Sequence, residues 1–509
     1  MALLRKVLIA NRGEIAVRIV RACRERGLAS VAVFSDCDRT ARHVRMADEA
    51  WPLGGNTPAE SYLRSDAVIE LAKRSGADAV HPGYGFLAEN AGFAEACADA
   101  GLTFVGPTPA AIRTMGNKTA ARTAALAAGV AIVPGSDTAL PPGCSDEDVA
   151  RAAREVGYPV MLKAVAGGGG KGMRVVGEEA ELTSALRAAR SEAQSSFGDA
   201  SVYLERRLAD PRHIEVQLLG DVHGTVLPFV ERECSIQRRH QKVLEESPSV
   251  AIRPEVRLAL MDAAARVGRH VGYTSAGTIE FLLDASERFY FLEMNTRLQV
   301  EHPVTEMVSG IDLVDWQLRL AAGEPLALDP HALATPRGHA IEARIYAEDP
   351  DDRFLPSPGR VTHLRPAAGP GIRDDGGITA PGDVPIYYDP LVAKLIAWGG
   401  DRTHAISRLA RALREYEIEG IKTTIPFFRW LLTNEDYLAA RVDTTWLDRV
   451  LGDRAGEPFW ASDEPVADLA SFAAAIETCA ARTRPQAAPS APTPTVSGWA
   501  AAARREALR

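Results

Sequence analysis

Residues 158–176 read YPVMLKAVAGGGGKGMRVV and contain a run of four consecutive glycines. Two short apolar runs, YPVMLKAV and RVV, flank a glycine-rich segment, so the stretch is expected to close as a β-hairpin. Glycine lacks a Cβ atom, which lets backbone N–H groups approach phosphate oxygens closely. With Lys163 on the first strand, the stretch predicts a lid over nucleotide phosphates. The residues of its tip are Gly167, Gly168, Gly169, Gly170, Lys171, Gly172 and Met173.

Two other interpretations of the glycine-rich segment compete with the lid. A Walker A loop needs serine or threonine directly after its lysine and a helix beyond it. Gly172 follows Lys171, and RVV indicates a strand, so the Walker A interpretation fails. A flexible surface hairpin without a ligand remains the plain alternative to the lid.

The chain before and around the lid divides into two blocks. Residues 1–115 alternate apolar strands such as KVLIA with helix-like segments, which predicts a parallel sheet with helices on its faces. Residues 116–335 carry strand candidates with hairpin spacing, among them HIEVQLLGD, TVLPFVERECSIQ, TIEFLLD and FYFLEMN. This second block is a predicted α+β domain that includes the lid at about residues 133–208.

The chain after the lid domain divides into two further blocks. Residues 336–447 combine the strand candidates HAIEARIYAED, GRVTHLRPA and KLIAWG with a helix from Arg402 to Glu415, which predicts a mixed cap domain. Residues 448–509 form a tail, and its segment 484–498 is rich in Pro and Ala, as extended linkers are.

Composition excludes several classes of protein. The net charge of −9 gives no general attraction to nucleic acid or to anionic membranes. No apolar run reaches the roughly 18 residues of a membrane helix. The six cysteines show no CxxC or Cys/His spacing, which argues against a zinc site and a disulfide framework. We therefore expect a cytoplasmic protein with neither nucleic acid nor membrane as partner.

Lysine is scarce in this chain. Only eight of its 58 basic residues are lysine, so arginine supplies almost all of the solvated positive charge. A lysine that is retained against this bias is expected to have a role that needs lysine. The eight are Lys6, Lys73, Lys118, Lys163, Lys171, Lys242, Lys394 and Lys422.

Acidic residues in two apolar strand candidates predict a metal site. Glu280 lies in TIEFLL and Glu293 in FLEMN, and Asn295 follows two residues later on the same face. Carboxylate and amide oxygens suit Mg²⁺ held between protein and nucleotide phosphates. The alternative is a pair of acids that face solvent at a strand edge.

The segment NTRLQVEHP, residues 295–303, combines a guanidinium, an amide and a carboxylate. Arg297 could hold a small planar anion through two hydrogen bonds, Gln299 could orient it, and Glu301 could take its proton. An ordinary surface loop is the alternative. The basic segment RECSIQRRHQK, residues 232–242, is a second candidate anion loop, because it lacks the interleaved aromatic residues of a nucleic-acid patch.

Taken together, these segments resemble the biotin carboxylase family within the ATP-grasp superfamily. The resemblance runs from about residue 4 to 447. It rests on ANRGEIAVRI, HPGYGFLAEN, MGNKTAAR, KAVAGGGGKGMRVV, ECSIQRRHQKVLEE, TIEFLL, FLEMNTRLQVEHPVTE and GHAIEARIYAEDP. One departure is Ala166, where many relatives have a fifth glycine.

The resemblance implies a fold and a set of site residues. The fold is ATP-grasp, of mixed α/β and α+β class, with an N-terminal parallel α/β domain, a glycine-rich lid and a C-terminal mixed cap domain. The implied catalytic and bicarbonate residues are Lys242, Arg297, Gln299, Val300, Glu301 as general base and Arg344 as stabiliser of the biotin enolate. The implied nucleotide and further pocket residues are Lys118, Lys163, Glu205, Leu208, His213, Gln237 and His240. Implied metal ligands are Glu280 and Glu293, with Asn295 beside them.

The resemblance also implies cofactors and partners. ATP, Mg²⁺ with Mn²⁺ as an alternative, and bicarbonate would be used to carboxylate biotin. The expected partners are a biotin carboxyl carrier protein or domain, a second copy of this chain, and a carboxyltransferase subunit. None of the lysines lies between two methionines, so we expect the chain itself to carry no biotin. Two alternatives stay open: another ATP-grasp carboxylate-amine or thiol ligase, and a non-catalytic scaffolding subunit of a carboxylase complex.

Overall fold

The computed structural model describes residues 4–136, 139–165, 173–454, 456–459 and 472–479. The glycine tip of the lid, from Gly167 to Gly172, lies outside these residues, as does the Pro/Ala-rich segment 484–498. The chain forms two units, Met1–Phe459 and Trp460–Arg509. In the second unit residues 472–479 are helical, and everything below concerns the first.

A five-stranded sheet in the order β3-β2-β1-β4-β5 forms the N-terminal part, and all its pairings are parallel. This confirms the predicted parallel α/β arrangement. Strands of such sheets are buried on both faces, which explains the uninterrupted apolar run of the first strand. The strands are β1 Lys6–Ile9, β2 Ala29–Phe34, β3 Glu49–Pro52, β4 Ala79–His81 and β5 Thr103–Phe104. The helices are α1 Gly13–Glu25, α2 Arg42–Met46, α3 Ser65–Ser75, α4 Ala91–Asp99, α5 Pro109–Gly116 and α6 Lys118–Ala127.

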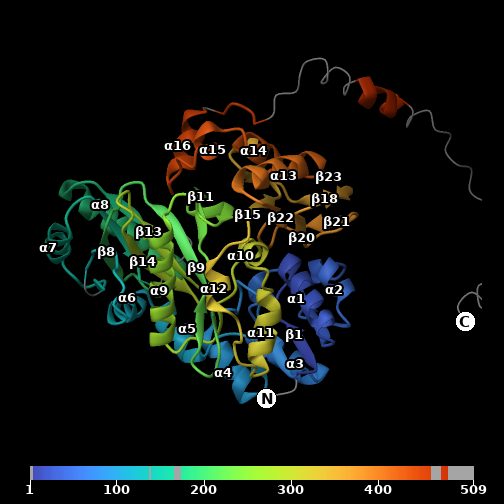
Figure 1. Cartoon of the computed structure of the whole chain (residues 1–509), viewed down its shortest axis with the longest axis horizontal. Coiled ribbons are helices and arrows are strands. Elements are labelled where there is room, and N and C mark those ends of the chain that lie inside the picture. The colour runs from blue at the N-terminus through green and yellow to red at the C-terminus, as the bar shows by residue number, and fades with distance from the viewer. Residues whose placement is uncertain (1–3, 137–138, 166–172, 455, 460–471, 480–509) are drawn as a thin grey trace, which may run out of the picture. The chain divides into compact units, whose positions relative to one another are not determined.

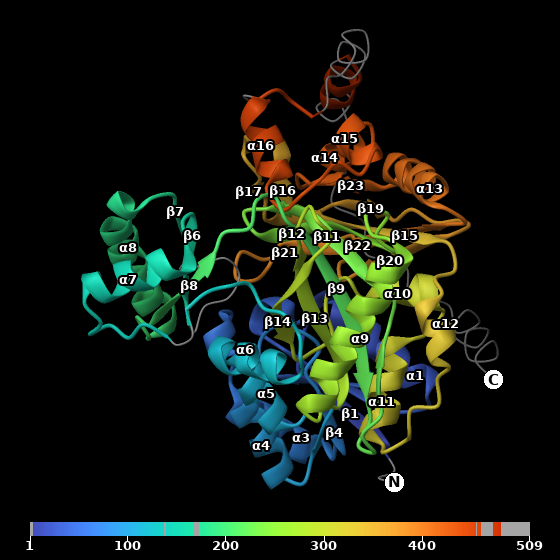
Figure 2. The same ribbon diagram turned by 60° about the vertical axis from the view of Figure 1, so that its left-hand side comes forward.

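The lid is a separate small sheet in the order β7-β6-β8. The predicted hairpin is confirmed by the antiparallel pairing of β6 with β7, in which Val160 faces Val176. Figure 2 shows the lid elements grouped to one side of the larger sheet. The elements are α7 Asp146–Val156, β6 Val160–Ala164, β7 Arg174–Val176, α8 Glu179–Phe197 and β8 Val202–Arg206.

One large sheet joins the middle and C-terminal parts of the chain. Its order is β14-β13-β9-β11-β12-β15-β22-β20, with β10 paired to β9 (Figure 1). The antiparallel pairing of β12 with β15 makes it continuous. Its strands are β9 Arg212–Gly220, β10 Val226–Pro228, β11 Arg232–Arg238, β12 Gln241–Ser247, β13 Ser275–Leu283, β14 Phe289–Asn295, β15 His339–Tyr346, β20 Ile372–Gly376 and β22 Leu391–Gly399.

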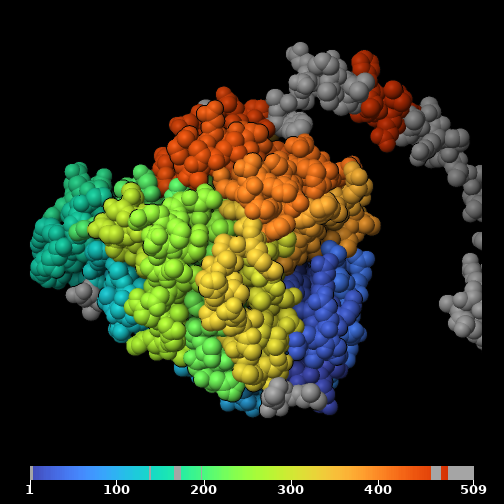
Figure 3. Space-filling model, viewed as in Figure 1, coloured from blue at the N-terminus to red at the C-terminus, as the bar shows by residue number. Residues whose placement is uncertain are grey.

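Helices and short strands complete the first unit. In Figure 3 the orange residues of the C-terminal part lie directly against the blue N-terminal residues. The helices are α9 Pro254–His270, α10 His302–Ser309, α11 Leu313–Ala321, α12 Pro330–Ala334, α13 Arg402–Glu415, α14 Ile425–Leu431, α15 Glu435–Leu438 and α16 Trp446–Asp453. The short strands are β16 Glu348–Asp349, β17 Leu355–Pro356, β18 Gly359–Val361, β19 His363–Arg365, β21 Gly382–Val384 and β23 Glu417–Glu419. No helix among the described residues has both the length and the apolar character needed to cross a membrane.

Two strand predictions were wrong in extent. TVLPFVERECSIQ forms β10 and β11 instead of one strand, although both pair with β9. The pairing is interrupted between them, where the Val230 amide donates to the Leu333 carbonyl. GRVTHLRPA also divides, into β18 and β19, because these two halves pair with different strands, β21 and β23. In both cases a contact with a residue distant in sequence interrupts the strand, and local pattern does not predict such contacts.

Candidate active site

The Lys242 ammonium lies at the centre of three buried carboxylates. Its Nζ donates to Glu215 Oε2 at 2.5 Å, to Glu280 Oε1 at 2.7 Å and to Glu301 Oε1 at 2.7 Å. Lys242 lies in β12, Glu215 in β9 and Glu280 in β13, and Glu301 directly precedes α10. Burial alone would lower the pKa of Lys242, but the three carboxylates raise it well above its ordinary value. Lys242 is therefore a fixed positive charge inside the protein.

Arg344 contacts the other carboxylate oxygen of Glu301. Its Nη2 donates to Glu301 Oε2 at 3.0 Å, and its Nε donates to Glu245 Oε1 at 2.6 Å. Burial alone would raise the pKa of Glu301, but Lys242 and Arg344 lower it far below its ordinary value. Burial raises the pKa of Glu245 to about 7, although the positive charge of Arg344 acts to lower it. Glu301 is thus held as an ionised carboxylate between two cations.

The fully buried Arg232 ties the loop 295–301 to the sheet. Its guanidinium contacts Glu215, donates to Gln217 at 2.9 Å and donates to Gln299 Oε1 at 2.8 Å. Gln299 in turn donates to Glu280 Oε1 at 2.9 Å. Sequence reasoning assigned no role to Glu215 or Glu245. It placed Arg232 in a candidate anion loop, but the segment 232–242 lies mainly in strands β11 and β12. In each case the sequence offers one signal, a charged side chain within a strand that is otherwise largely buried. Burying such a charge is energetically costly unless it is paired.

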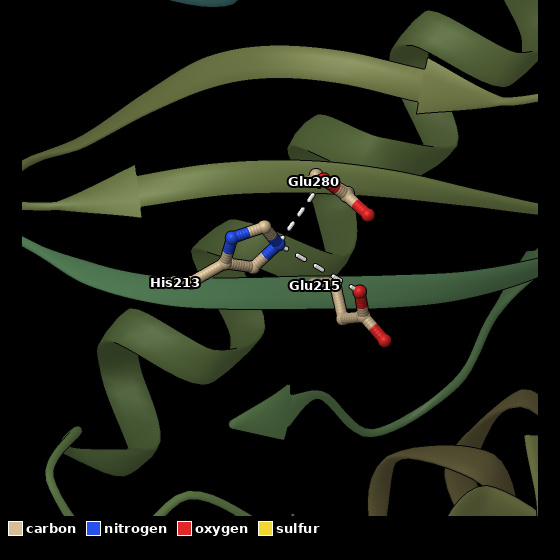
Figure 4. Close-up of side chains that lie close together, drawn as sticks. All are labelled: His213, Glu215 and Glu280. Atoms are coloured by element: carbon tan, nitrogen blue, oxygen red, sulfur yellow. Dashed lines mark ion pairs between the residues drawn. The ribbon is translucent and has the colours of Figure 1, made fainter. Parts of the chain in front are cut away.

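His213 and Gln237 lie beside this cluster. Figure 4 shows His213 and Glu215 of β9 facing Glu280 of β13, and His213 Nε2 lies 3.1 Å from Glu280 Oε2. Gln237 Nε2 lies 3.0 Å from His213 Nδ1. His213, Glu215 and Glu280 have donor atoms close enough together to hold a metal ion. Lys242 Nζ donates to both Glu215 and Glu280, so a cation held by these three residues would share the two carboxylates with the ammonium.

The candidate metal ligands face one another across two strands. Glu280 and Glu293 are direct partners in the antiparallel pairing of β13 with β14, as the sequence predicted for neighbouring strands. Asn295 donates to Glu280 Oε1 at 2.8 Å, and Lys118 Nζ lies 3.7 Å from Glu293 Oε2. Paired cross-strand residues share one face of a sheet, so the carboxylates of Glu280 and Glu293 could together hold a hard divalent cation such as Mg²⁺.

Arg297 forms an ion pair with an acid from the N-terminal part of the chain. Its Nε donates to Glu89 Oε2 at 2.8 Å, and its Nη2 donates to Asn295 Oδ1 at 3.0 Å. Arg297, Val300 and Arg344 line one cavity of about 490 Å³. Its other walls include Asn11, Gly13, Tyr84, Gly85, Phe86, Tyr346, Tyr387 and Tyr388. The site therefore has an anion-binding side and a partly aromatic pocket next to it.

Two sequence motifs without an assigned role form much of this pocket. ANRGE, from residue 10, and HPGYG, from residue 81, are linked by Asn11, which donates to the carbonyls of Pro82 and Tyr84 at 2.7 Å each. Gly83 has a φ of 63°, and a Cβ atom there would lie 2.9 Å from the Asn11 amide nitrogen. Glycine at position 83 therefore allows these two loops to approach each other closely at the pocket.

The candidate nucleotide residues lie between the lid and the large sheet. Lys163 and Arg122 both contact the buried Glu205 of β8. Leu208 and Met173 are half-buried, while His240 is exposed at the β11–β12 turn with a φ of 66°. The structure thus brings Lys163 and Glu205 together.

Three family models match this chain. They are "Biotin carboxylase, N-terminal domain" at residues 3–112, "Carbamoyl-phosphate synthase L chain, ATP binding domain" at 117–329, and "Biotin carboxylase C-terminal domain" at 342–449. The biotin carboxylase of Nostoc sp. is 51% identical over 445 residues, which cover 87% of this chain and 99% of the relative. The biotin carboxylase of Halalkalibacterium halodurans is 49% identical over 452 residues, which cover 89% of this chain and 99% of the relative.

Solved structures agree with these relatives. The biotin carboxylase domain dimer of Hydrogenobacter thermophilus 2-oxoglutarate carboxylase, in complex with MgADP, ADP and bicarbonate, superposes with a TM-score of 0.86. It is 44% identical, and the match covers 91% of this chain and 100% of that one. The biotin carboxylase of Campylobacter jejuni in an ATP complex has a TM-score of 0.85 at 44% identity, over 88% and 99% of the two chains. The predicted ATP-grasp fold is confirmed, and the chain belongs to the biotin carboxylase family of ATP-dependent ligases.

Proposed function

We propose that this chain uses ATP and bicarbonate to carboxylate biotin, with Glu301 as the general base. The observation that carries the proposal is the position of Glu301 between Lys242 and Arg344, at 2.7 Å and 3.0 Å, beside the cavity that Arg344 and Arg297 line. The ionised carboxylate can act as a base, and the fixed cations can bind an anion. The adjoining pocket has room for the acceptor.

Bicarbonate activation is the first step of the proposed reaction. Bicarbonate competes with Glu301 for Lys242 and also contacts Arg297. The competition weakens the ion pair with Lys242 that lowers the pKa of Glu301. Glu301 then takes the bicarbonate proton, and the resulting oxyanion attacks the γ-phosphoryl group of ATP to give carboxyphosphate and ADP. Gln299, held by Arg232, keeps the anion in register. Catalysis of this step is positioning and charge neutralisation.

The nucleotide and its cation are assigned to neighbouring groups. We propose that Glu280 and Glu293, with Asn295, hold Mg²⁺, which neutralises phosphate charge when it is bound. Lys118, next to Glu293, and Lys163, on the lid strand β6, are the lysines that we assign to the phosphate oxygens. The lid excludes water and so protects carboxyphosphate from hydrolysis.

Carboxyl transfer to biotin follows in the pocket. Carboxyphosphate breaks into CO₂ and phosphate, the phosphate takes the proton from N1′ of biotin, and N1′ attacks CO₂. Arg344 lines the pocket and stabilises the negative charge of the biotin enolate. The pocket volume of about 490 Å³ is in the range of small-molecule sites.

Biotin-stimulated ATP cleavage that depends strictly on bicarbonate tests this function. Another ATP-grasp ligase would cleave ATP with an amine or thiol acceptor and without bicarbonate. A scaffolding subunit would cleave no ATP, with or without bicarbonate.

The finer assignments belong to the same proposal. We propose three domains, 1–115, 116–335 and 336–447, followed by a tail from 448, which the three matched ranges support. The biotin would arrive on a carrier protein or domain and pass its carboxyl group to a carboxyltransferase. A homodimer is supported by the dimer of the Hydrogenobacter relative. A cytoplasmic location fits cysteines that lack the spacing of a disulfide framework.

A further inference from the structure

We propose that Lys394 is a positioning residue that holds the peptide bond directly before Glu301 in its working orientation. The inference rests on the proposed function, because it assigns Lys394 to the loop that carries the base. Lys394 belongs to β22 of the C-terminal part and has no exposed surface. Its Nζ donates to the Val300 carbonyl oxygen at 2.9 Å.

The Val300 carbonyl belongs to the peptide bond between Val300 and Glu301. A hydrogen bond to this oxygen therefore fixes the plane from which the Glu301 side chain departs. The preceding carbonyl, of Gln299, is also held, since the His302 amide lies 3.3 Å and His302 Nδ1 lies 2.8 Å from it. The two peptide bonds in front of the proposed base are thus anchored separately.

Lys394 acts beside Arg344. The two residues are direct partners in the antiparallel pairing of β15 with β22, so their side chains lie on the same face of the sheet. Arg344 contacts the carboxylate of Glu301, and Lys394 contacts the carbonyl of Val300. Two neighbouring cations therefore hold consecutive residues of one loop, one by its side chain and the other by its backbone.

The surroundings of Lys394 explain why a lysine is retained here. Its Nζ lies 3.3 Å from Glu14 Oε2 of α1 and 3.9 Å from Asp375 Oδ2 of β20. The compact ammonium donates to one carbonyl while it lies within 4 Å of two carboxylates on different elements, and the larger planar guanidinium of arginine does not fit the same closed space. Arg373 extends the network by contacting Asp375 at 2.7 Å and Glu306 of α10 at 2.6 Å.

This network joins the three parts of the chain at the base. Glu14 comes from the N-terminal part, Asp375 and Lys394 come from the C-terminal part, and Val300 precedes α10 of the middle part. Loss of the ammonium would free the Val300–Glu301 peptide bond and displace the Glu301 carboxylate relative to Lys242. A displacement of about 1 Å at a reacting group costs up to about a hundredfold in rate.

The test compares Lys394→Met with the wild-type 509-residue chain, by fixation of labelled bicarbonate into free biotin and by the KM values for bicarbonate and ATP. We expect kcat/KM for bicarbonate to fall at least about tenfold while the KM for ATP stays within about twofold. Lys73→Met, on the exposed face of α3, is the matched control and should change neither constant. Unchanged bicarbonate kinetics in a folded Lys394→Met variant would overturn the inference.

A second variant separates positioning from the cost of a buried, unpaired Glu14. The double variant Glu14→Gln/Lys394→Met removes both charges, and the inference requires its bicarbonate defect to persist. Recovery of wild-type bicarbonate kinetics, or failure of both variants to fold, would assign Lys394 to fold stability alone and contradict the inference. A wild-type chain that fixes no bicarbonate would instead contradict the proposed function.

Discussion

Lys242 Nζ lies 2.7 Å from Glu301 Oε1, and the same ammonium lies 2.7 Å from Glu280 Oε1. One cation therefore links the proposed base to a proposed metal ligand. An anion that enters between Lys242 and Glu301 would meet a positive charge and a proton acceptor at once. Because the proposed base and the proposed metal ligand contact the same ammonium, one bound bicarbonate could be deprotonated by Glu301 and then attack the nucleotide phosphate without moving to another site.

Replacement of Glu301 by Gln should lower bicarbonate-dependent biotin carboxylation at least about a hundredfold, because the amide cannot accept the bicarbonate proton. The KM for ATP should stay within about twofold, since Glu301 contacts Lys242 and Arg344 and none of the proposed nucleotide residues. Steady-state kinetics check both values. Glu255→Gln, exposed in α9, is the control, and near-normal turnover of Glu301→Gln would remove this residue from the base role.

Replacement of Arg344 by Gln should separate the two halves of the reaction. We expect biotin carboxylation to fall at least about tenfold more than bicarbonate-dependent ATP cleavage, because enolate charge develops only in the second half. Parallel assays of ADP release and carboxybiotin formation measure the two rates. Arg360→Gln, exposed in β18, serves as the control, and equal loss of both activities would contradict an enolate-specific role.

Glu280→Gln and Glu293→Gln should each raise the Mg²⁺ concentration needed for half-maximal turnover at least about fivefold, because an amide is a weaker ligand than a carboxylate for a hard cation. Removal of Mg²⁺ by chelation should abolish ATP cleavage in the wild-type chain. The titration is run at saturating ATP for both variants. Coinciding Mg²⁺ curves for wild type and both variants would disprove the metal assignment.

Glu246 of β12 makes stability depend on pH. Burial alone would raise its pKa, but His339 at 2.7 Å and Arg402 at 2.7 Å lower the pKa from 4.5 to about 2. Because the folded-state pKa is depressed, the stabilisation is complete above about pH 4.5 and disappears as the pH falls toward about 2. Glu246→Gln should therefore lose about 3 kcal/mol of unfolding free energy at pH 7.

Denaturant unfolding at several pH values measures this effect. The difference between wild type and Glu246→Gln should shrink as the pH falls below about 4.5. A difference that stays constant down to the lowest pH at which both proteins fold would show that Glu246 does not titrate in this way.

Local pattern in the sequence predicts several elements well. The helix from Arg402 to Glu415 has the bounds that its periodicity predicts, and the lid hairpin pairs as expected from two apolar runs around a glycine segment. Glu280 and Glu293 face one another because the strands TIEFLL and FLEMN are close in sequence and pair directly. Periodicity and short-range turns carry this information.

The remaining contacts of the site join residues that are far apart in the sequence. Arg344 meets Glu301 across 43 residues, and Lys394 meets Val300 across 94. Glu215 and Arg232 look like ordinary charged residues of strands until the sheet places them beside Lys242 and Gln299. Such pairings follow from strand order, which a single sequence does not specify.

The purified chain can be incubated with MgATP, free biotin and labelled bicarbonate, and ADP and carboxybiotin can be quantified in the same sample. We expect biotin-stimulated ADP release that requires bicarbonate, is matched by labelled carboxybiotin and is lost in Glu301→Gln. ATP cleavage that proceeds equally well without bicarbonate, or that leaves biotin unlabelled, would rule out the proposed function.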